Sequence, residues 1–126
     1  MKELETSIQE LIRIATDLAQ PLSLEGECSS GTVAAALLTT AGNVYSGACI
    51  DLHCALGFCA ERAAAAEMLK SRETSVKLMV AVQSDGEVVP PCGACREFLM
   101  QLDKRNGATE VILSNGQTRT IAQLLP

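Results

Sequence analysis

Aromatic side chains are nearly absent from this chain of 126 residues: they make up 2% of it, and there is no Trp. Basic side chains are also few, with 10 Lys and Arg against 15 Asp and Glu, which gives a net charge of −5. Proteins that bind nucleic acids need basic surfaces for the phosphates and often use aromatic rings to stack on the bases. We therefore expect no nucleic-acid partner.

Long apolar runs are missing as well. No segment approaches the roughly 18 apolar residues of a membrane span, and the first ten residues, MKELETSIQE, carry charges where a secretion signal is apolar. We expect a cytoplasmic protein with no membrane partner. In a reducing compartment, the six cysteines would serve as metal ligands, catalytic thiols or core residues rather than as disulfides.

What the chain does contain indicates one globular domain over residues 1–126. Hydrophobic residues make up 48% of the sequence and charged residues 20%, and this length has room for one domain but not two. The core must be aliphatic and rich in alanine. A core that thin favours an oligomer, and we expect residues 63–66, four alanines in a row, to form a close-packed contact between subunits.

Hydrophobic periodicity and chain breakers predict an alternation of helices and strands. Leu4 to Ala19 have helical spacing, and Pro21 ends that segment. Residues 32–40 are typical of a buried strand, although their alanines also suit a helix. Further strands are expected at 44–50, 76–82, 109–113 and 118–120, helices at 59–70 and 93–104, and a last helical turn opened by Thr120 and Gln123. This order predicts an α/β fold, a three-layer α/β/α sandwich with a mixed sheet of about five strands.

Three cysteines have a common setting. They form two groups in the sequence, and each group comes just after a loop, at the start of a predicted helix. Cys59 lies in Cys-Ala-Glu, and Cys92 with Cys95 in Pro-Cys-Gly-Ala-Cys. Helix N-termini offer free N–H groups and a positive dipole end, which favour thiolates. Two such ends brought together would hold three thiolates around one Zn²⁺ ion, with water in the fourth position, which is the arrangement of catalytic rather than structural zinc.

Glu61 follows Cys59 in the first helical turn and would reach a zinc-bound water without being a ligand. A carboxylate there can take a proton from the water and return it to a leaving group. Zn²⁺ with three thiolates carries a formal charge of −1, which opposes ionisation of the water. Arg62 and Arg96 are the candidates for compensating that charge by donating hydrogen bonds to the thiolates.

Other interpretations of the cysteines remain open. A Cys-x-x-Cys pair is often a redox pair, although here Pro precedes it and no Trp accompanies it. It is also often half of a structural zinc site, for which His53 or Cys54 would supply the fourth ligand. A purely structural zinc module, however, has no use for the carboxylate of Glu61 beside the metal.

The pairing of Cys-Ala-Glu with Pro-Cys-x-x-Cys resembles the zinc deaminases. The flanking residues, LGFCAER at 56–62 and PCGACR at 91–96, are similar to those of the small homotetrameric cytidine deaminases that act on free nucleosides. The resemblance implies that Cys59, Cys92 and Cys95 bind one zinc ion per chain and that Glu61 carries the proton. It also implies that the backbone N–H of Ala60 contacts the base, that ammonia is lost from C4 of a cytosine ring, and that the chain forms a homotetramer.

The substrate contacts depart from that family's pattern. The Asn-x-Glu that holds the ribose falls at Cys49-Ile50-Asp51, where Asp51 keeps a carboxylate and Cys49 lacks the amide. The aromatic residue expected near the base falls at Gly31. Blasticidin S deaminases are similar in length and also have a His six residues before the first zinc cysteine, as His53 is here. The expected substrate is thus a cytosine nucleoside or close analogue, with blasticidin S or another amino-heterocycle as the alternative.

Overall fold

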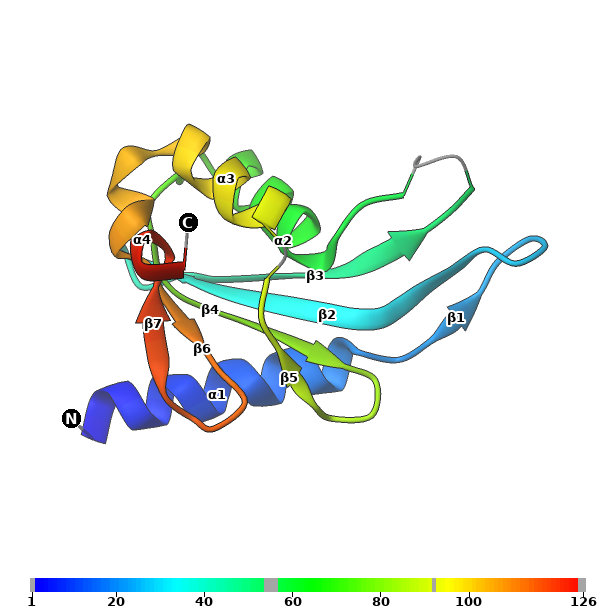
Figure 1. Cartoon of the computed structure of the whole chain (residues 1–126), viewed down its shortest axis with the longest axis horizontal. Coiled ribbons are helices and arrows are strands. Elements are labelled where there is room, and N and C mark those ends of the chain that lie inside the picture. The colour runs from blue at the N-terminus through cyan, green and yellow to red at the C-terminus, as the bar shows by residue number, and fades with distance from the viewer. Residues whose placement is uncertain (1, 54–56, 92, 125–126) are drawn as a thin grey trace.

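The computed structural model describes residues 2–53, 57–91 and 93–124, and in this part of the chain a mixed sheet lies between helices on both faces (Figure 1). Helix α1 (Lys2–Leu18) covers one face, while α2 (Ala60–Lys70) and α3 (Gly93–Leu102) lie over the other. This confirms the predicted three-layer α/β/α fold. No helix in the described residues is long and apolar enough to cross a membrane.

The sheet has seven strands among the described residues rather than the predicted five or so. Strand β2 pairs antiparallel with β1, β3 and β4, β4 pairs antiparallel with β5 and parallel with β6, and β6 and β7 form an antiparallel hairpin. The two strands not predicted, β1 and β5, have two residues each. The strand bounds are β1 (Leu22–Ser23), β2 (Ser29–Thr39), β3 (Val44–Asp51), β4 (Val76–Gln83), β5 (Val88–Val89), β6 (Glu110–Ile112) and β7 (Thr118–Thr120).

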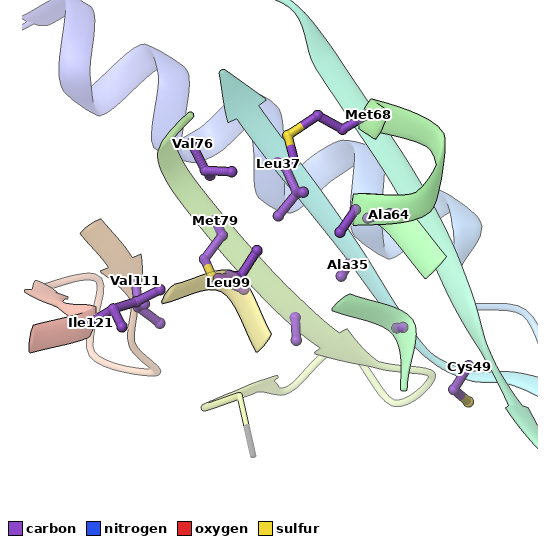
Figure 2. Close-up of a cluster of buried hydrophobic side chains, with 13 residues drawn as sticks. Ala35, Leu37, Cys49, Ala64, Met68, Val76, Met79, Leu99, Val111 and Ile121 are labelled. Atoms are coloured by element: carbon purple, nitrogen blue, oxygen red, sulfur yellow. The ribbon is translucent and has the colours of Figure 1, made fainter. Parts of the chain in front are cut away.

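Two hydrophobic layers hold the helices to the sheet. On the α1 side, Leu11 and Ala15 pack against Leu78 and Val80 of β4. On the other side, residues of α2 and α3 meet the opposite face of β2 and β4, with Leu37, Met68, Met79 and Leu99 among them (Figure 2). Cys49 lies at the end of this second cluster away from Ile121. The core is aliphatic, as the near absence of aromatic residues predicts.

Helix α2 lies directly on β3 because Gly47 has no side chain. A Cβ atom at Gly47 would come within 2.5 Å of the Ala64 backbone nitrogen and 2.7 Å of the Ala63 Cβ. Ala64 and Ala65 are fully buried against the chain's own sheet. The expectation that residues 63–66 form a subunit contact is therefore wrong for these two alanines, whose small size serves packing inside the chain.

The third predicted helix ends at Leu102, two residues earlier than expected. Asp103 begins a new 3₁₀ helix (Lys104–Ala108), its carboxylate accepting a hydrogen bond from the Arg105 backbone nitrogen. Within that helix, the buried Asn106 donates to the carbonyls of Thr74 and Leu99 and accepts from the Val76 backbone nitrogen. A buried amide with all these partners ties the end of α3 to the start of β4.

The last helix, α4 (Ile121–Leu124), begins with the predicted capping box. The Thr120 backbone nitrogen donates to Gln123 Oε1 at 2.9 Å, and the Gln123 backbone nitrogen donates to Thr120 Oγ1 at 3.2 Å. These reciprocal bonds satisfy backbone donors that a helix start leaves without partners.

Candidate active site

The start of α2 positions the first cysteine. Cys59 is the N-cap residue and has an extended backbone, with φ −74° and ψ 153°. Just before it, Phe58 and Ile50 exchange two backbone hydrogen bonds of 3.0 Å. Gly57 permits this close approach, since a Cβ atom there would lie 2.1 Å from the Ile50 carbonyl oxygen. The backbone of Cys59 is thereby held at the N-terminus of α2, at the positive end of the helix dipole.

Arg62 connects the two helix N-termini. Its Nη2 donates to Cys59 Sγ at 3.8 Å. Hydrogen bonds to the sulfurs of Cys59 and then Cys95 raise the pKa of the Arg62 guanidinium. Cys95, in the first turn of α3, is completely buried. Cys59 and Cys95 therefore lie around a single guanidinium although 36 positions of sequence separate them.

The described part of this site fits a metal ion that binds thiolates. Cys59 and Cys95 supply two sulfur donors at helix N-termini, a chemistry that suits Zn²⁺. Cys92 lies outside the described residues, and among those that are described no group of three potential ligands occurs. Of the alternative fourth ligands, His53 is exposed and Cys54 is outside the described residues.

Glu61 is the buried acid of the site. Its exposed fraction is 6%. Burial raises the pKa of the Glu61 carboxyl, while a backbone hydrogen bond and the charge of Arg62 oppose that rise. A carboxyl group whose pKa is raised toward neutrality can exchange a proton in both directions.

A pocket of about 460 Å³ opens over these residues. It brings together six of the predicted site residues, which come from β3 and from the start of α2: Cys49, Asp51, Cys59, Ala60, Glu61 and Arg62. The rest of the wall comes from β2, from the end of β3 and the residue after it, from the two residues before Cys59 and from the region of β5, and consists of Thr32, Val33, Ile50, Leu52, Gly57, Phe58, Val89 and Pro90.

Arg96 has a different setting from Arg62. Its Nη1 donates to the carbonyl oxygen of Leu124 at 2.7 Å, which ties α3 to α4. Its Nε is buried and has no hydrogen-bond partner among the described atoms. The structure thus gives Arg96 a hydrogen bond between two helices, and its part in charge compensation stays a prediction.

Thr32 is a pocket residue that the sequence did not reveal. The pairing of β2 with β3 shifts between Ser30, opposite Ile50, and Ala34, opposite Ala48. Three residues of β2, at 31–33, thus face Cys49 alone, a bulge of the kind that redirects side chains beside active sites. The Thr32 hydroxyl lies 3.2 Å from Cys49 Sγ and 3.2 Å from Asp51 Oδ2.

Gly31 makes the bulge possible. Its φ of +89° is in the region that favours glycine, and a Cβ atom would lie 2.1 Å from the carbonyl oxygen of Gln20. This glycine is the only sequence signal that could have indicated the bulge, and it does not by itself identify Thr32.

Comparison with known proteins identifies related sequences. Residues 5–111 match the family model of the cytidine and deoxycytidylate deaminase zinc-binding region. A cytidine deaminase of Halalkalibacterium halodurans is 36% identical over 99 residues, which cover 75% of this chain and 74% of that protein. One of Sporosarcina psychrophila is 34% identical over 99 residues, 75% of this chain and 71% of that protein.

Solved structures support the fold. The cytidine deaminase of Mycobacterium tuberculosis superimposes with a TM-score of 0.78 at 24% sequence identity. The superposition covers 94% of this chain and 93% of that one. The two chains thus share the same fold.

Proposed function

The chain belongs to the cytidine and deoxycytidylate deaminase family and is a hydrolytic deaminase, and from this premise we propose that it deaminates a cytosine nucleoside or close analogue in a zinc-dependent reaction. One observation carries the proposal: the buried carboxyl of Glu61 lies in the same pocket wall as Cys59, the Ala60 backbone and Asp51. A proton-transfer group, a metal ligand and a group able to bind a sugar are thereby combined in one cavity.

Cys59, Cys92 and Cys95 would hold one zinc ion per chain. When bound, the ion would lower the pKa of a water molecule, so that the water can give up a proton and attack a ring carbon near neutral pH. The helix N-termini at Cys59 and Cys95, together with the hydrogen bonds from Arg62, offset the charge of the three thiolates.

Glu61 would carry the proton. In the overall reaction water is consumed, a C–O bond forms at C4 of the ring, and the C4–N bond breaks to release ammonia. Glu61 accepts the proton given up by the water and delivers it toward the ring and the leaving amine. Its burial supports this task, because the raised pKa brings the carboxyl closer to the pH at which it must both accept and donate.

The charges of the pocket favour a substrate without phosphate. Asp51 and Glu61 are acidic, and Arg62 is engaged by the thiols of Cys59 and Cys95. A phosphate group next to Asp51 would be repelled. The N–H of Ala60, at the start of α2, is a suitable donor for the carbonyl of the base, while Asp51 and Cys49 lie where the sugar would bind.

We extend the proposal to the whole chain. Residues 1–126 would form one catalytic domain, since both hydrophobic layers share one sheet. A site made of reduced thiols agrees with a cytoplasmic location. A homotetramer is expected, and sedimentation at micromolar concentration checks it: a stable monomer would contradict the expectation.

The proposed function is tested by loading the protein with zinc and measuring ammonia release from a panel of substrates. Cytidine, deoxycytidine, deoxycytidylate and blasticidin S are the informative members. We expect turnover of the nucleosides and much slower turnover of the nucleotide. If blasticidin S is the only substrate that is deaminated, the protein is a blasticidin S deaminase instead. If none of the substrates releases ammonia, a structural zinc module is favoured.

A further inference from the structure

We propose that Thr32 is a positioning residue, which holds the carboxylate of Asp51 so that it accepts a hydrogen bond from a hydroxyl at the 2′ or 3′ position of the sugar. This inference rests on the proposed function and deepens it. Nothing in the motifs of the chain indicates Thr32, because its position beside Asp51 results from the bulge in β2.

The bulge collects hydrogen-bond donors around one oxygen atom. The hydroxyl of Thr32 donates to Asp51 Oδ2 at 3.2 Å, and the thiol of Cys49 donates to the same oxygen at 3.4 Å. The Val33 backbone nitrogen in turn donates to Cys49 Sγ at 3.4 Å. Since Val33 and Thr32 both belong to the bulge, the local conformation of β2 sets the orientation of the carboxylate.

Asp51 needs such support because it is exposed at the end of β3. An exposed carboxylate that can rotate freely must lose that freedom when it binds a ligand, and this loss weakens binding. Within the described part of the chain, both contacts go to Oδ2. Oδ1 thus keeps its capacity to accept a hydrogen bond from the substrate.

The chemistry of the groups that hold the Asp51 carboxylate indicates the kind of ligand. Thr32, Cys49 and the Val33 backbone are neutral donors, so the contacts that hold Asp51 bring no cation into the pocket. A carboxylate held in this way suits an uncharged hydroxyl donor such as the sugar of a nucleoside. The same set does not offer a binding site for phosphate.

The test compares Thr32→Val, which removes the hydroxyl and keeps the β-branched shape, with Thr32→Ser, which keeps the hydroxyl. Thr118→Val is the matched control, because Thr118 is also half-buried and donates to a carboxylate across two strands, Glu110 Oε1 at 3.2 Å, away from the pocket. For each zinc-loaded protein, one measures kcat and KM for cytidine. One also measures the inhibition constants of uridine and of 2′,3′-dideoxyuridine, which lacks both ring hydroxyls.

We expect Thr32→Val to raise KM for cytidine and the inhibition constant of uridine by roughly three- to tenfold, the value of one hydrogen bond. The constant for dideoxyuridine and kcat should stay within about twofold of the parent. Thr32→Ser should recover most of the loss, and Thr118→Val should resemble the parent.

Three results would overturn the inference. Equal weakening of uridine and dideoxyuridine by Thr32→Val would mean that Thr32 only stabilises the fold of the pocket. Unchanged constants would mean that Asp51 does not depend on Thr32. If the parent chain does not turn over cytidine, both the proposed function and the sugar site are refuted. This result is distinguishable from the other two because it is seen in the unaltered protein.

Discussion

Arg62 Nη2 lies 3.8 Å from Cys59 Sγ, so the first turn of one helix supplies a thiol and the positive charge that faces it. Residues three apart on a helix are neighbours on its surface, and this contact follows from that spacing. Glu61 lies between them in the sequence and is buried in the same pocket. A single helical turn thus combines the proposed metal ligand, the proposed proton carrier and the positive charge that would compensate the thiolate.

Replacing Arg62 with Gln should weaken zinc binding while leaving the fold intact. The change removes the charge that faces Cys59 and Cys95, and the loss of such a supporting contact typically lowers metal affinity by roughly 10- to 100-fold. Competition with a chromogenic chelator measures the effect. Lys70→Gln, at the exposed far end of α2, is the control for removal of a positive charge, and an affinity equal to that control would contradict the role of Arg62.

The change Glu61→Gln should leave folding and zinc content unaltered and reduce deamination by at least roughly 10²–10⁴-fold, because the amide cannot accept the proton. Steady-state ammonia release, with zinc measured in the same sample, checks this. Glu67→Gln provides the control, since Glu67 belongs to the same helix and is exposed. Full activity of Glu61→Gln would exclude the mechanism, whatever the substrate.

Gly47→Ala should destabilise the protein by about 1–3 kcal/mol, the usual cost of forcing an extra methyl group into a close-packed contact. The methyl group would press against Ala63 and Ala64 and move α2, which also carries Glu61, away from β3. Urea denaturation measures the free energy of unfolding. At Gly107 an added Cβ would lie 3.4 Å or more from its neighbours, so Gly107→Ala should cost much less; equal costs would refute the packing argument.

Asp103 should make stability depend on pH in the acid range. Hydrogen bonds from the Arg105 side chain, then from its backbone nitrogen and from Thr74, hold the pKa of the Asp103 carboxyl well below its ordinary value of 3.8. The folded state therefore favours the charged carboxylate. This stabilisation is fully present above the pKa of the unfolded chain and is lost as the pH falls through the lower pKa of the folded state.

The variant Asp103→Asn tests this linkage. At pH 7 it should unfold at a lower urea concentration than the parent, and the difference between the two midpoints should shrink as the pH falls from 7 to roughly 2. Asp17→Asn, which removes an exposed carboxylate from α1, is the control for net charge. A gap between parent and Asp103→Asn that stays constant from pH 7 to pH 2 would show that the carboxylate contributes through something other than its charge.

The sequence predicted most of the fold because the main elements have strong local patterns. The apolar run of β4 and the helical spacing of α1 are visible without any tertiary information. The short strands β1 and β5 were missed because two residues carry no periodicity, and they become strands only through pairing with β2 and β4. The early end of α3 was missed because Asp103 caps a new helix only in combination with Arg105 and Thr74.

The site was predictable to the extent that its chemistry is carried by local motifs. Cys59 and Glu61 are close in sequence, and both were expected at the helix start where the structure has them. Thr32 was not predictable, because its contact with Asp51 spans 19 positions of sequence and depends on a shift in strand register. Such shifts arise from the fit of whole strands rather than from a residue pattern.

The contact between Gly31 and Gln20 limits how this pocket can change by mutation. From the resemblance to cytidine deaminases, we expect an aromatic ring at position 31. A single substitution cannot introduce one, because even a methyl group would collide with the backbone where the chain leaves α1. A ring at this position becomes acceptable only after the segment around Gln20 has moved. The two segments must therefore evolve together, and designs that aim to alter the base contact of this enzyme have to rebuild both.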